Sequence, residues 1–393
     1  MRDMKDCGIE WLGNIPDDWE KGRIDSYYNL RSTKVSDKEY QPLSVTMNGI
    51  LPQLETAAKT NAHDDRKLVK KGDFAINSRS DRRGSCGISN YTGSVSLINT
   101  ILAPKGEMHP KYFDWLFHTV QFSDEFYKWG HGIVDDLWTT TYQDMKKINI
   151  PVPPLEEQKY IADFLDYKCE EIDKLYSVVQ YEIETLESYK QSVIAAAVKK
   201  GDETRFKYIA KVCTNLVNPE LYQDYKQIAP DSIEKNTGKI IIDRTVEEAG
   251  VDSWNHLFYK GQILYSKIRP VLNKVAISPY DGLCSADMYP IETSQDIRFL
   301  KYVMLSNSFV EQVDLVTRDR IKMPKINQDE LGNIRVLMPS LEEQSSIADY
   351  LDSMTGEVDG IISKKQEQLA VLTDYKKSII YEYVTGKKEV PEI

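Results

Sequence analysis

The chain has little of what marks secreted, membrane or metal-binding proteins. Its 393 residues include five cysteines, and none of them forms a CxxC pair, so neither a disulfide framework nor a zinc site is expected. No apolar run approaches the roughly 18 residues that span a bilayer. The first residues also lack the apolar stretch of a signal peptide. These absences favour a protein of the reducing cytoplasm.

The sequence also lacks the common signatures of catalysis. It has no GxxxxGK[ST] phosphate loop, no GxGxxG nucleotide turn and no HExxH metal motif. Its five histidines are dispersed, and a lone histidine is more often a surface or core residue than a ligand. Paired carboxylates such as Glu156–Glu157 are more often solvated than catalytic. No catalytic residue, no metal site and no cofactor of its own are therefore predicted.

The net charge of −11 argues at first against nucleic acid as a partner. The acidic excess, however, lies mainly in residues 151–200 and 339–393, and the segments before each of them are near neutral. Net charge governs solubility and nonspecific attraction and leaves open what a local basic patch binds.

The most informative feature is an internal repeat. Residues 155–194 and 341–380 align without a gap and are identical at 18 of 40 positions. Both copies begin with Leu-Glu-Glu-Gln and continue with Ile-Ala-Asp and Leu-Asp. A repeat of this length indicates two duplicated domains rather than a solenoid. A duplicated protein presents two related surfaces, and we expect it to recognise something that itself has two parts.

The repeats are predicted to be helices. Apolar residues recur every seven positions, which is typical of a coiled-coil seam. Pro151, Pro153 and Pro154 prevent an earlier helix start, and Gly201 ends the helix. Asp166 and Asp352 are expected to cap a second, longer helix after a short first one, and about 30 residues beyond them would span about 45 Å. Antiparallel packing of the two copies is the simplest arrangement. The seam of the first copy comprises Ile172, Val179, Leu186 and Val193, widened by Leu175, Ile183 and Tyr189.

The intervening segments look weakly related to each other. In both, a glycine turn precedes an alternating apolar run and then a polar-basic loop, at 71–79 and 260–269. Short strands mixed with helices indicate an α+β fold. We therefore predict two pseudo-repeated α/β domains, separated by two long antiparallel coiled-coil-like helices. The predicted domains are residues 1–150, 151–200, 201–338 and 339–393.

The polar-basic loops are candidate nucleic-acid contacts. Residues 77–85 place three arginines among small hydrogen-bonding residues directly after a strand, and residues 266–274 hold the matching place in the second half. Arginine can fork onto guanine, asparagine onto adenine, and serine or threonine onto phosphate. A solvated loop is the plain alternative. For the helices, the plain alternative is a spacer that only joins two domains.

At this point the sequence resembles the specificity subunits of type I restriction-modification systems. The resemblance rests on "PPLEEQ..IA.FLD" and its second copy, on the opening Gly8–Trp19, and on Leu43–Ile50. The second copy departs from the pattern with Pro339-Ser340 in place of Pro153-Pro154, which affects only the turn. The resemblance covers the whole chain in register and is most specific in the repeats.

The resemblance implies a non-catalytic subunit. Each target-recognition domain, 1–150 and 201–338, would read one half of a bipartite double-stranded DNA site. The helices would set the gap and dock two methyltransferase subunits, which use S-adenosylmethionine to methylate adenine. Motor-nuclease subunits that use ATP and Mg²⁺ would complete the complex.

By position, the implied DNA contacts and the implied partner contacts form two sets. The DNA set is Thr46, Asn48, Ser78, Arg79, Arg82, Arg83, Ser266, Lys267, Arg269, Lys274, Arg320 and Lys322. The partner set is Leu155, Glu156, Glu157, Ile161, Leu165, Leu341, Glu342, Glu343, Ile347 and Leu351.

Three alternatives remain open on the sequence. A coiled-coil adaptor with no DNA role would show no salt-dependent binding to duplex DNA. An enzyme hidden in the recognition domains would cleave or methylate DNA alone. A specificity subunit of another restriction class would differ in its partners.

Overall fold

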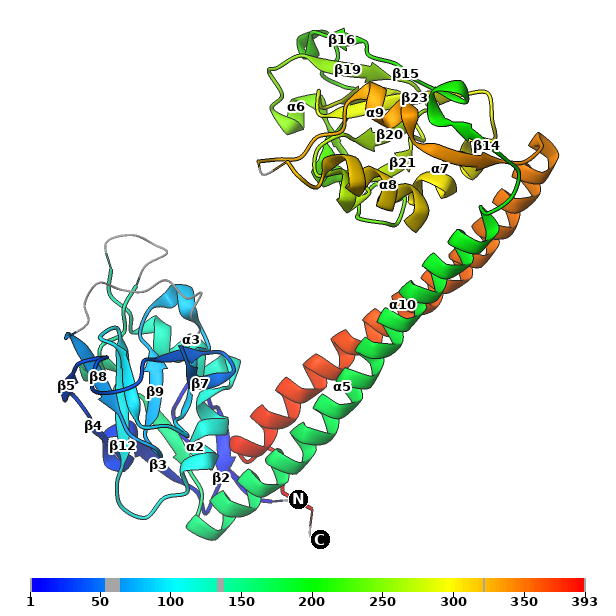
Figure 1. The fold of residues 1–393 in the computed structure, drawn as a ribbon. Coiled ribbons are helices and arrows are strands. Elements are labelled where there is room, and N and C mark those ends of the chain that lie inside the picture. Colours follow the sequence, from blue (N-terminus) through cyan, green and yellow to red (C-terminus); the bar gives the residue numbers. More distant parts are fainter. Residues whose placement is uncertain (1, 54–63, 133–137, 321, 392–393) are drawn as a thin grey trace. The chain divides into compact units, whose positions relative to one another are not determined.

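The computed structural model describes residues 2–53, 64–132, 138–320 and 322–391. The chain divides into two compact units. Unit 1 comprises Met1–Val179 with Glu367–Ile393, and unit 2 comprises Gln180–Gln366. Each unit contains a mixed α/β domain and parts of two long helices, α5 (Leu155–Ala197) and α10 (Leu341–Val384) (Figure 1).

The two long helices pack antiparallel within unit 1. The ring of Phe164 on α5 lies 4.5 Å from the ring of Tyr383 on α10. Two turns further along α5, Asp173 accepts a hydrogen bond of 2.6 Å from Lys376, which lies earlier on α10. Rising numbers on one helix thus meet falling numbers on the other.

The same antiparallel order holds within unit 2. Glu182 on α5 accepts from Lys365 at 2.6 Å, and Lys190 donates to Asp359 at 2.7 Å. Lys365 stands where the seven-residue pattern of the second repeat calls for an apolar residue, and its charge is paired across the helices. The predicted fold class, α/β domains with antiparallel coiled-coil-like helices, is confirmed.

One interhelix ion pair is itself duplicated. Lys190 and Lys376 occupy the same position of the repeat, and so do Asp359 and Asp173, so each unit contains one copy of the pair. The copy in unit 2 is the more buried. The side chains of Lys190 and Asp359 are 9% and 23% exposed, whereas those of Lys376 and Asp173 in unit 1 are 29% and 62% exposed. Lys239 adds a second contact to Asp359 at 2.7 Å.

The expected break near the start of each long helix is wrong. Each helix is continuous, with 43 residues in α5 and 44 in α10, so α5 is about 65 Å long at about 1.5 Å per residue. Asp166 and Asp352 lie inside the helices and do not cap them. Leu175 and Tyr189, expected in the seam, are 55% and 48% exposed.

Unit 1 contains short antiparallel sheets covered by helices. One four-stranded sheet has the order β10-β9-β12-β4, and a three-stranded sheet has the order β11-β8-β5. Three two-stranded pairs join β13 with β3, β6 with β7, and β1 with β2. The strands are β1 (Met4–Asp6), β2 (Asn14–Pro16), β3 (Glu20–Arg23), β4 (Tyr28–Leu30), β5 (Lys34–Val35), β6 (Leu43–Thr46), β7 (Gly49–Pro52), β8 (Arg66–Val69), β9 (Phe74–Asn77), β10 (Cys86–Ile88), β11 (Gly93–Ser96), β12 (Asn99–Pro104) and β13 (Asn149–Val152). The short helices are α1 (Ile24–Tyr27), α2 (Pro110–Phe117), α3 (Val120–Lys128) and α4 (Tyr142–Met145).

Unit 2 repeats this plan with one larger sheet. Its sheets have the orders β15-β23-β20-β21 and β16-β19-β22-β17-β18, and β14 pairs with β24. The strands are β14 (Asp202–Arg205), β15 (Ala210–Val212), β16 (Leu216–Val217), β17 (Lys226–Ile228), β18 (Arg244–Thr245), β19 (Asn255–Phe258), β20 (Ile263–Ser266), β21 (Val275–Ile277), β22 (Gly282–Cys284), β23 (Met288–Thr293) and β24 (Arg335–Met338). The short helices are α6 (Val246–Ala249), α7 (Ile297–Leu305), α8 (Asn307–Thr317) and α9 (Gln328–Asn333).

A close approach between strands is also duplicated. In unit 1 a parallel bridge joins Pro42 to Ser94, and in unit 2 strands β17 and β22 pair in parallel. At each crossing a glycine leaves room for the neighbouring backbone. A Cβ at Gly93 would lie 2.5 Å from the carbonyl oxygen of Gln41, and a Cβ at Gly282 would lie 2.5 Å from the carbonyl oxygen of Lys226.

The repeated Leu-Glu-Glu-Gln segment attaches each domain to its long helix. Gln158 is buried, accepts from the backbone N–H of His109 at 2.9 Å, and donates to the carbonyl of Pro153. Gln344 does the same with Asp296 at 3.0 Å and Pro339 at 2.8 Å. Both accepted bonds come from the residue before α2 or α7, so the same glutamine fixes the same helix start in each unit.

The aspartate that ends each repeat motif makes a second attachment. Asp166 accepts from the indole N–H of Trp115 on α2 at 2.9 Å. Asp352 accepts from the hydroxyl of Tyr302 on α7 at 2.6 Å. Between glutamine and aspartate, the apolar residues of the motif enter the core of their own unit. Internal docking thus explains why the glutamine, the final aspartate and the isoleucine, alanine and leucine between them are the same in both motifs.

We expect Gln344→Leu to lower the free energy of unfolding by about 1–3 kcal/mol, because the buried N–H of Asp296 would lose its acceptor. Glu342→Gln, on the exposed side of the same helical turn, is the matched control and should change stability by less than about 0.5 kcal/mol. Urea unfolding followed by circular dichroism measures both. Equal stabilities of the two variants would contradict the attachment.

The duplicated ion pair offers an internal comparison. Hydrogen bonds from Lys190 and Lys239 outweigh burial and lower the pKa of Asp359 below the ordinary 3.8. Asp359→Asn should therefore cost about 1.5–3 kcal/mol at neutral pH, and Asp173→Asn, which is exposed, about 0–1 kcal/mol. Because a lowered pKa stabilises the fold only where the carboxyl is ionised, the cost of Asp359→Asn should shrink as the pH falls below about 4. Unfolding free energies at several pH values test this.

Candidate nucleic-acid interface

The basic loop of unit 1, residues 77–85, is held on both sides by backbone bonds. We call it the Arg loop. Asn77 N–H donates to the carbonyl of Ser85 at 2.9 Å and closes the loop at its base. On the other side, Ser80 N–H donates to the carbonyl of Trp138 at 2.9 Å. The hydroxyl of Tyr127 donates to the carbonyl of Asn77 at 2.9 Å, so the loop is closed on itself and is held by two other segments.

The three arginines of the Arg loop remain exposed. The side chains of Arg79, Arg82 and Arg83 are 42%, 68% and 52% exposed. Arg79 and Arg82 both face Asp81, and Arg83 pairs with Asp124 at 2.7 Å while lying over the ring of Tyr127. Exposed pairs of this kind contribute about 0–1 kcal/mol. The guanidinium groups can therefore exchange these partners for phosphate or base edges at little cost.

In unit 2 the fold joins two basic segments that are far apart in the sequence. Residues 266–274, the second basic loop, begin at the end of β20, and residues 322–326, the strap, precede α9. Arg269 N–H donates to the carbonyl of Pro324 at 2.7 Å, and Ile326 N–H donates to the carbonyl of Lys267 at 2.9 Å. The strap therefore crosses the loop in the same way that Trp138 and its neighbours cross the Arg loop.

The backbone of this second site is strained. Arg269, Asn273 and Met323 have φ values of 42°, 47° and 46°, which side chains other than glycine rarely adopt. Such residues persist only where the surrounding structure holds them, and they gather at functional sites. With this backbone conformation, the side chain of Arg269 lies at the surface. Beside it, the Lys267 ammonium lies 5.3 Å from the centre of the Tyr289 ring.

Two of the residues expected to contact DNA are buried. Ser78 and Ser266 are 4% and 2% exposed, and their hydroxyls bond internally, to Thr100 at 3.0 Å and to the carbonyl of Ile268 at 3.0 Å. A buried, bonded hydroxyl cannot reach a duplex, so these two expectations are corrected. Both serines instead form buried hydrogen bonds within their own unit.

Other expected contacts are partly committed within their unit. Lys274 donates to the carbonyl of Pro230 at 2.5 Å. Arg320 bonds the carbonyl of Lys325 and the carboxylate of Glu330, and its hydrogen bond lowers the pKa of Glu330. Thr46 donates to the carbonyl of Gly49 at 2.9 Å and shapes the turn after β6. The expected residues that stay exposed without such bonds are Asn48, Arg82, Arg269 and Lys322.

Sequence reasoning missed the residues that organise the loops. Tyr127 lies 42 residues or more from the Arg loop, yet its hydroxyl holds two carbonyls of that loop and its ring underlies Arg83. Burial raises the pKa of this phenol, so it remains protonated and donates. Asp81, which faces Arg79 and Arg82, is the second such residue. Nothing in the local sequence distinguishes either residue, because each acts through tertiary contacts.

Three of the ten residues expected to dock a partner are buried in their own unit. Ile161, Leu165 and Leu351 are 0–1% exposed and belong to the cores. This expectation is corrected, because these side chains are not available to another protein. Leu155 and Ile347 are half-buried, whereas Leu341 is 58% exposed.

The acidic residues of the motif divide into two groups. Glu157 accepts from the indole N–H of Trp19 at 2.9 Å and pairs with Arg2. Glu343 accepts from the hydroxyl and the N–H of Ser340, and these bonds lower its pKa. Both are engaged at the starts of their helices. Glu156 and Glu342 remain on the surface.

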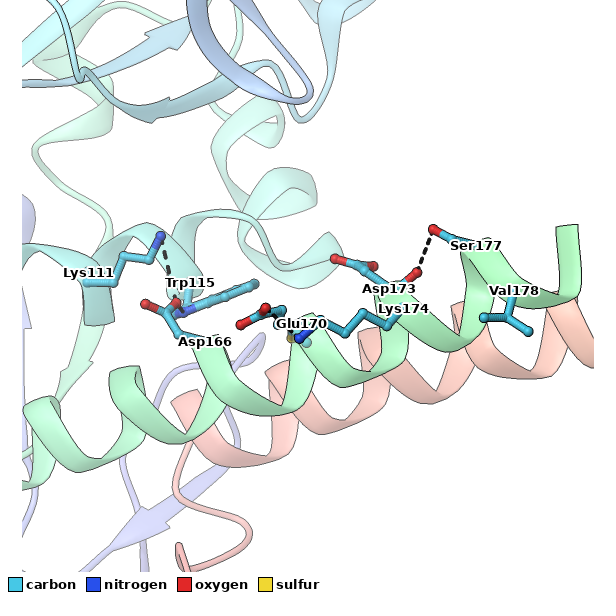
Figure 2. A pocket seen from close by; sticks show the side chains of 9 residues that line it. Lys111, Trp115, Asp166, Glu170, Asp173, Lys174, Ser177 and Val178 are labelled. Atoms are coloured by element: carbon cyan, nitrogen blue, oxygen red, sulfur yellow. Dashed lines mark hydrogen bonds and ion pairs between the residues drawn. The ribbon is translucent and has the colours of Figure 1, made fainter. Parts of the chain in front are cut away.

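A surface hollow of about 560 Å³ lies beside α2 and the first half of α5 (Figure 2). Its charged side chains are paired, Lys111 with Asp166 at 3.7 Å and Lys174 with Glu170 at 2.7 Å. Burial raises the pKa of the Cys169 thiol at its edge to about 11, so this cysteine is a weak nucleophile at neutral pH. The hollow thus contains paired charges and an inert thiol.

The described ranges contain neither a metal-binding cluster nor a membrane-spanning helix. Across 2–53, 64–132, 138–320 and 322–391, no cluster of three or more histidine, cysteine or acidic side chains is placed to hold a metal ion. Within these same ranges, no helix combines the length and apolar character needed to cross a membrane.

The geometry defines a class of protein: a tandem duplication in which each α/β unit carries a basic loop and is attached to a long-helix pair by the same glutamine and aspartate. A family model for the type I restriction modification DNA specificity domain matches the chain twice, over residues 16–176 and 190–371. The chain belongs to this family.

Individual relatives agree with the family. The specificity subunit of the type I restriction enzyme EcoDI of Escherichia coli is 31% identical over 282 residues, which cover 62% of this chain and 63% of that subunit. The match thus spans less than two thirds of that relative's length. The specificity subunit of the type I restriction enzyme MjaVIII of Methanocaldococcus jannaschii is 24% identical over 428 residues, covering 96% of this chain and 95% of that subunit.

A solved structure shares the fold. That structure is described as showing the structural basis of complex assembly and conformational transition of the type I R-M system. The aligned chain has a TM-score of 0.73 and 12% sequence identity, and the alignment covers 95% of this chain and 99% of that chain. At this identity the likeness shows the fold alone.

The burial pattern of the Arg loop separates a structural residue from a binding residue. Ser78→Ala should lower stability by about 1 kcal/mol through loss of its buried hydrogen bond and leave DNA affinity unchanged. Arg79→Ala should weaken binding to target DNA by about 1–3 kcal/mol with stability unchanged to within about 0.5 kcal/mol. Thermal unfolding and fluorescence anisotropy with duplex DNA measure the two quantities. The reverse pattern would show that the two roles are exchanged.

Proposed function

We propose that this chain is the DNA-reading specificity subunit of a type I restriction-modification complex and that it has no catalytic role of its own. In this proposal residues 1–150 and 201–338 are target-recognition domains, and each reads one half of a bipartite site. The observation that carries the proposal is the duplicated placement of a basic loop, crossed by a second segment, in both units of a family member.

The chemistry of the two sites supports DNA as the ligand. Arg79, Arg82 and Arg83 on one loop, and Lys267 and Arg269 on the other, present cations on rigid supports at the surface. Guanidinium groups can fork onto guanine or bind phosphate, and ammonium groups bind phosphate as point charges. Rigid presentation favours specific recognition, because little side-chain and loop entropy is lost on binding.

The difference between the sites supports a bipartite target with unlike halves. The Arg loop in unit 1 has ordinary backbone angles at Arg79, whereas Arg269 in unit 2 is strained. The segment between β6 and β7 is a two-residue turn, whereas 15 residues, 229–243, separate β17 from β18. Two differently shaped sites on one duplicated frame suit two different half-site sequences.

The long helices supply the surface for partner subunits in this proposal. Two methyltransferase subunits would dock, one at each copy of the repeat, and motor-nuclease subunits would join them. S-adenosylmethionine, ATP and Mg²⁺ would be used by those partners, in the cytoplasm where the chromosome lies. Because the inner residues of the motif are buried, Glu156, Glu342 and Leu341 are the expected partner residues that face outward and are available for such contacts.

Exchange of one domain tests the proposal. Residues 1–150 are replaced by the corresponding residues of another family member, and the chimera is expressed with the methyltransferase subunit of the same system. Methylome sequencing should show adenine methylation at a bipartite motif for the parent. The chimera should change one half of that motif and keep the other half and the spacing, because each domain has its own core.

The outcomes of the exchange are distinct. A motif altered in both halves would contradict the two-module reading of DNA. Absence of any methylated motif with the parent chain, in a host where the methyltransferase is produced, would contradict the role of specificity subunit. Methylation of DNA by the pure chain with labelled methyl donor would contradict the non-catalytic role.

A further inference from the structure

One carboxylate in the Arg loop lies between two arginines, closer to one than to the other. Oδ1 of Asp81 lies 3.1 Å from Nε of Arg79, and Oδ2 lies 3.8 Å from Nε of Arg82. Both contacts use Nε, the inner nitrogen of the guanidinium. Among the residues that the structure describes, no other carboxylate lies within ion-pair distance of either group.

The choice of nitrogen matters for base recognition. An arginine that reads guanine donates two parallel hydrogen bonds to O6 and N7 from one edge of its planar fork. A carboxylate on Nε leaves the two terminal nitrogens of Arg79 and Arg82 free to form that pair and reduces the number of rotamers open to each side chain. Arg83 differs, because Asp124 binds its terminal Nη1 and its plane rests on Tyr127.

We propose that Asp81 is a positioning residue that aims Arg79 and Arg82 at guanines in the half-site read by unit 1. This inference rests on the proposed function and deepens it. The same carboxylate repels phosphate, so it weakens binding of the loop to any duplex that offers no guanine in reach. Asp81 therefore sharpens discrimination in two ways, by orienting the forks and by opposing nonspecific contacts.

Unit 2 uses another means, which confines the effect to one half-site. Lys267 is placed by the ring of Tyr289, and Arg269 by a strained backbone that Pro324 holds. Within the described residues neither cation has a carboxylate at ion-pair distance. Removal of Asp81 should therefore leave recognition by unit 2 unchanged, which gives every experiment an internal control for folding.

The test selects bound sequences from a randomised duplex DNA library with the full chain and with Asp81→Asn, and compares the enriched motifs. The parent should enrich a bipartite motif with guanine in one half. In Asp81→Asn the preference for that guanine should fall by about 2- to 5-fold, because the fork itself remains and only an exposed ion pair that orients it is lost. The other half should be unchanged. Affinity for random duplex should rise, and its log–log salt slope should steepen by about one unit.

Asp124→Asn is the matched control, since it removes the same charge from a partner of the same loop. It should raise affinity for random duplex in the same way but keep the guanine preference. Arg79→Lys keeps the charge and loses the fork, so it should lose guanine preference at one position with the salt slope unchanged.

Three results would overturn the inference. They are an unchanged guanine preference in Asp81→Asn, an equal loss in Asp124→Asn, and a parent motif without guanine in the half that unit 1 reads. A parent chain that enriches no motif would instead contradict the proposed function itself.

Discussion

The structure depends on one hydrogen-bonded attachment that is present twice. In each unit a buried glutamine of the repeat, Gln158 or Gln344, accepts a hydrogen bond from the backbone N–H of the residue just before a domain helix. The same glutamine donates to the carbonyl of the proline five positions before it. A helix start leaves N–H groups without intrahelical partners, and burial makes any such group costly to leave unbonded. The glutamine meets this need and thereby fixes each α/β domain on the long-helix pair.

The position of each basic loop follows from that attachment. With α2 fixed on α5, the next helix, α3, presents Tyr127 beneath the Arg loop, and its hydroxyl binds two loop carbonyls. In unit 2, α7 and α8 precede the strap that crosses the second basic loop. Binding residues on loops are therefore placed by rigid elements, as is usual for recognition surfaces. The two loops can diverge in sequence while the frame that carries them stays duplicated.

Sequence patterns predicted much of the frame and less of the site. The prolines before Leu155 indicated roughly where the first long helix begins, and Gly201 where it ends, because both residue types oppose helix continuation. The expected break at Asp166 was wrong, because that aspartate binds Trp115 from within the helix. The exposed arginines were predicted correctly as loop residues. The serines beside them were misjudged, since local sequence does not reveal which side of a loop faces the core.

The sequence by itself determined the duplication, the helix pair and the α/β class, because these depend on repeated identity and on apolar periodicity along a single element. Only the tertiary structure decided which repeated residues face inward, which arginine nitrogen a carboxylate contacts, and which distant segment crosses each loop. Those features arise from contacts between residues far apart in the chain. Gln158 with His109, Tyr127 with Asn77, and Arg269 with Pro324 are such contacts, and no local pattern encodes them.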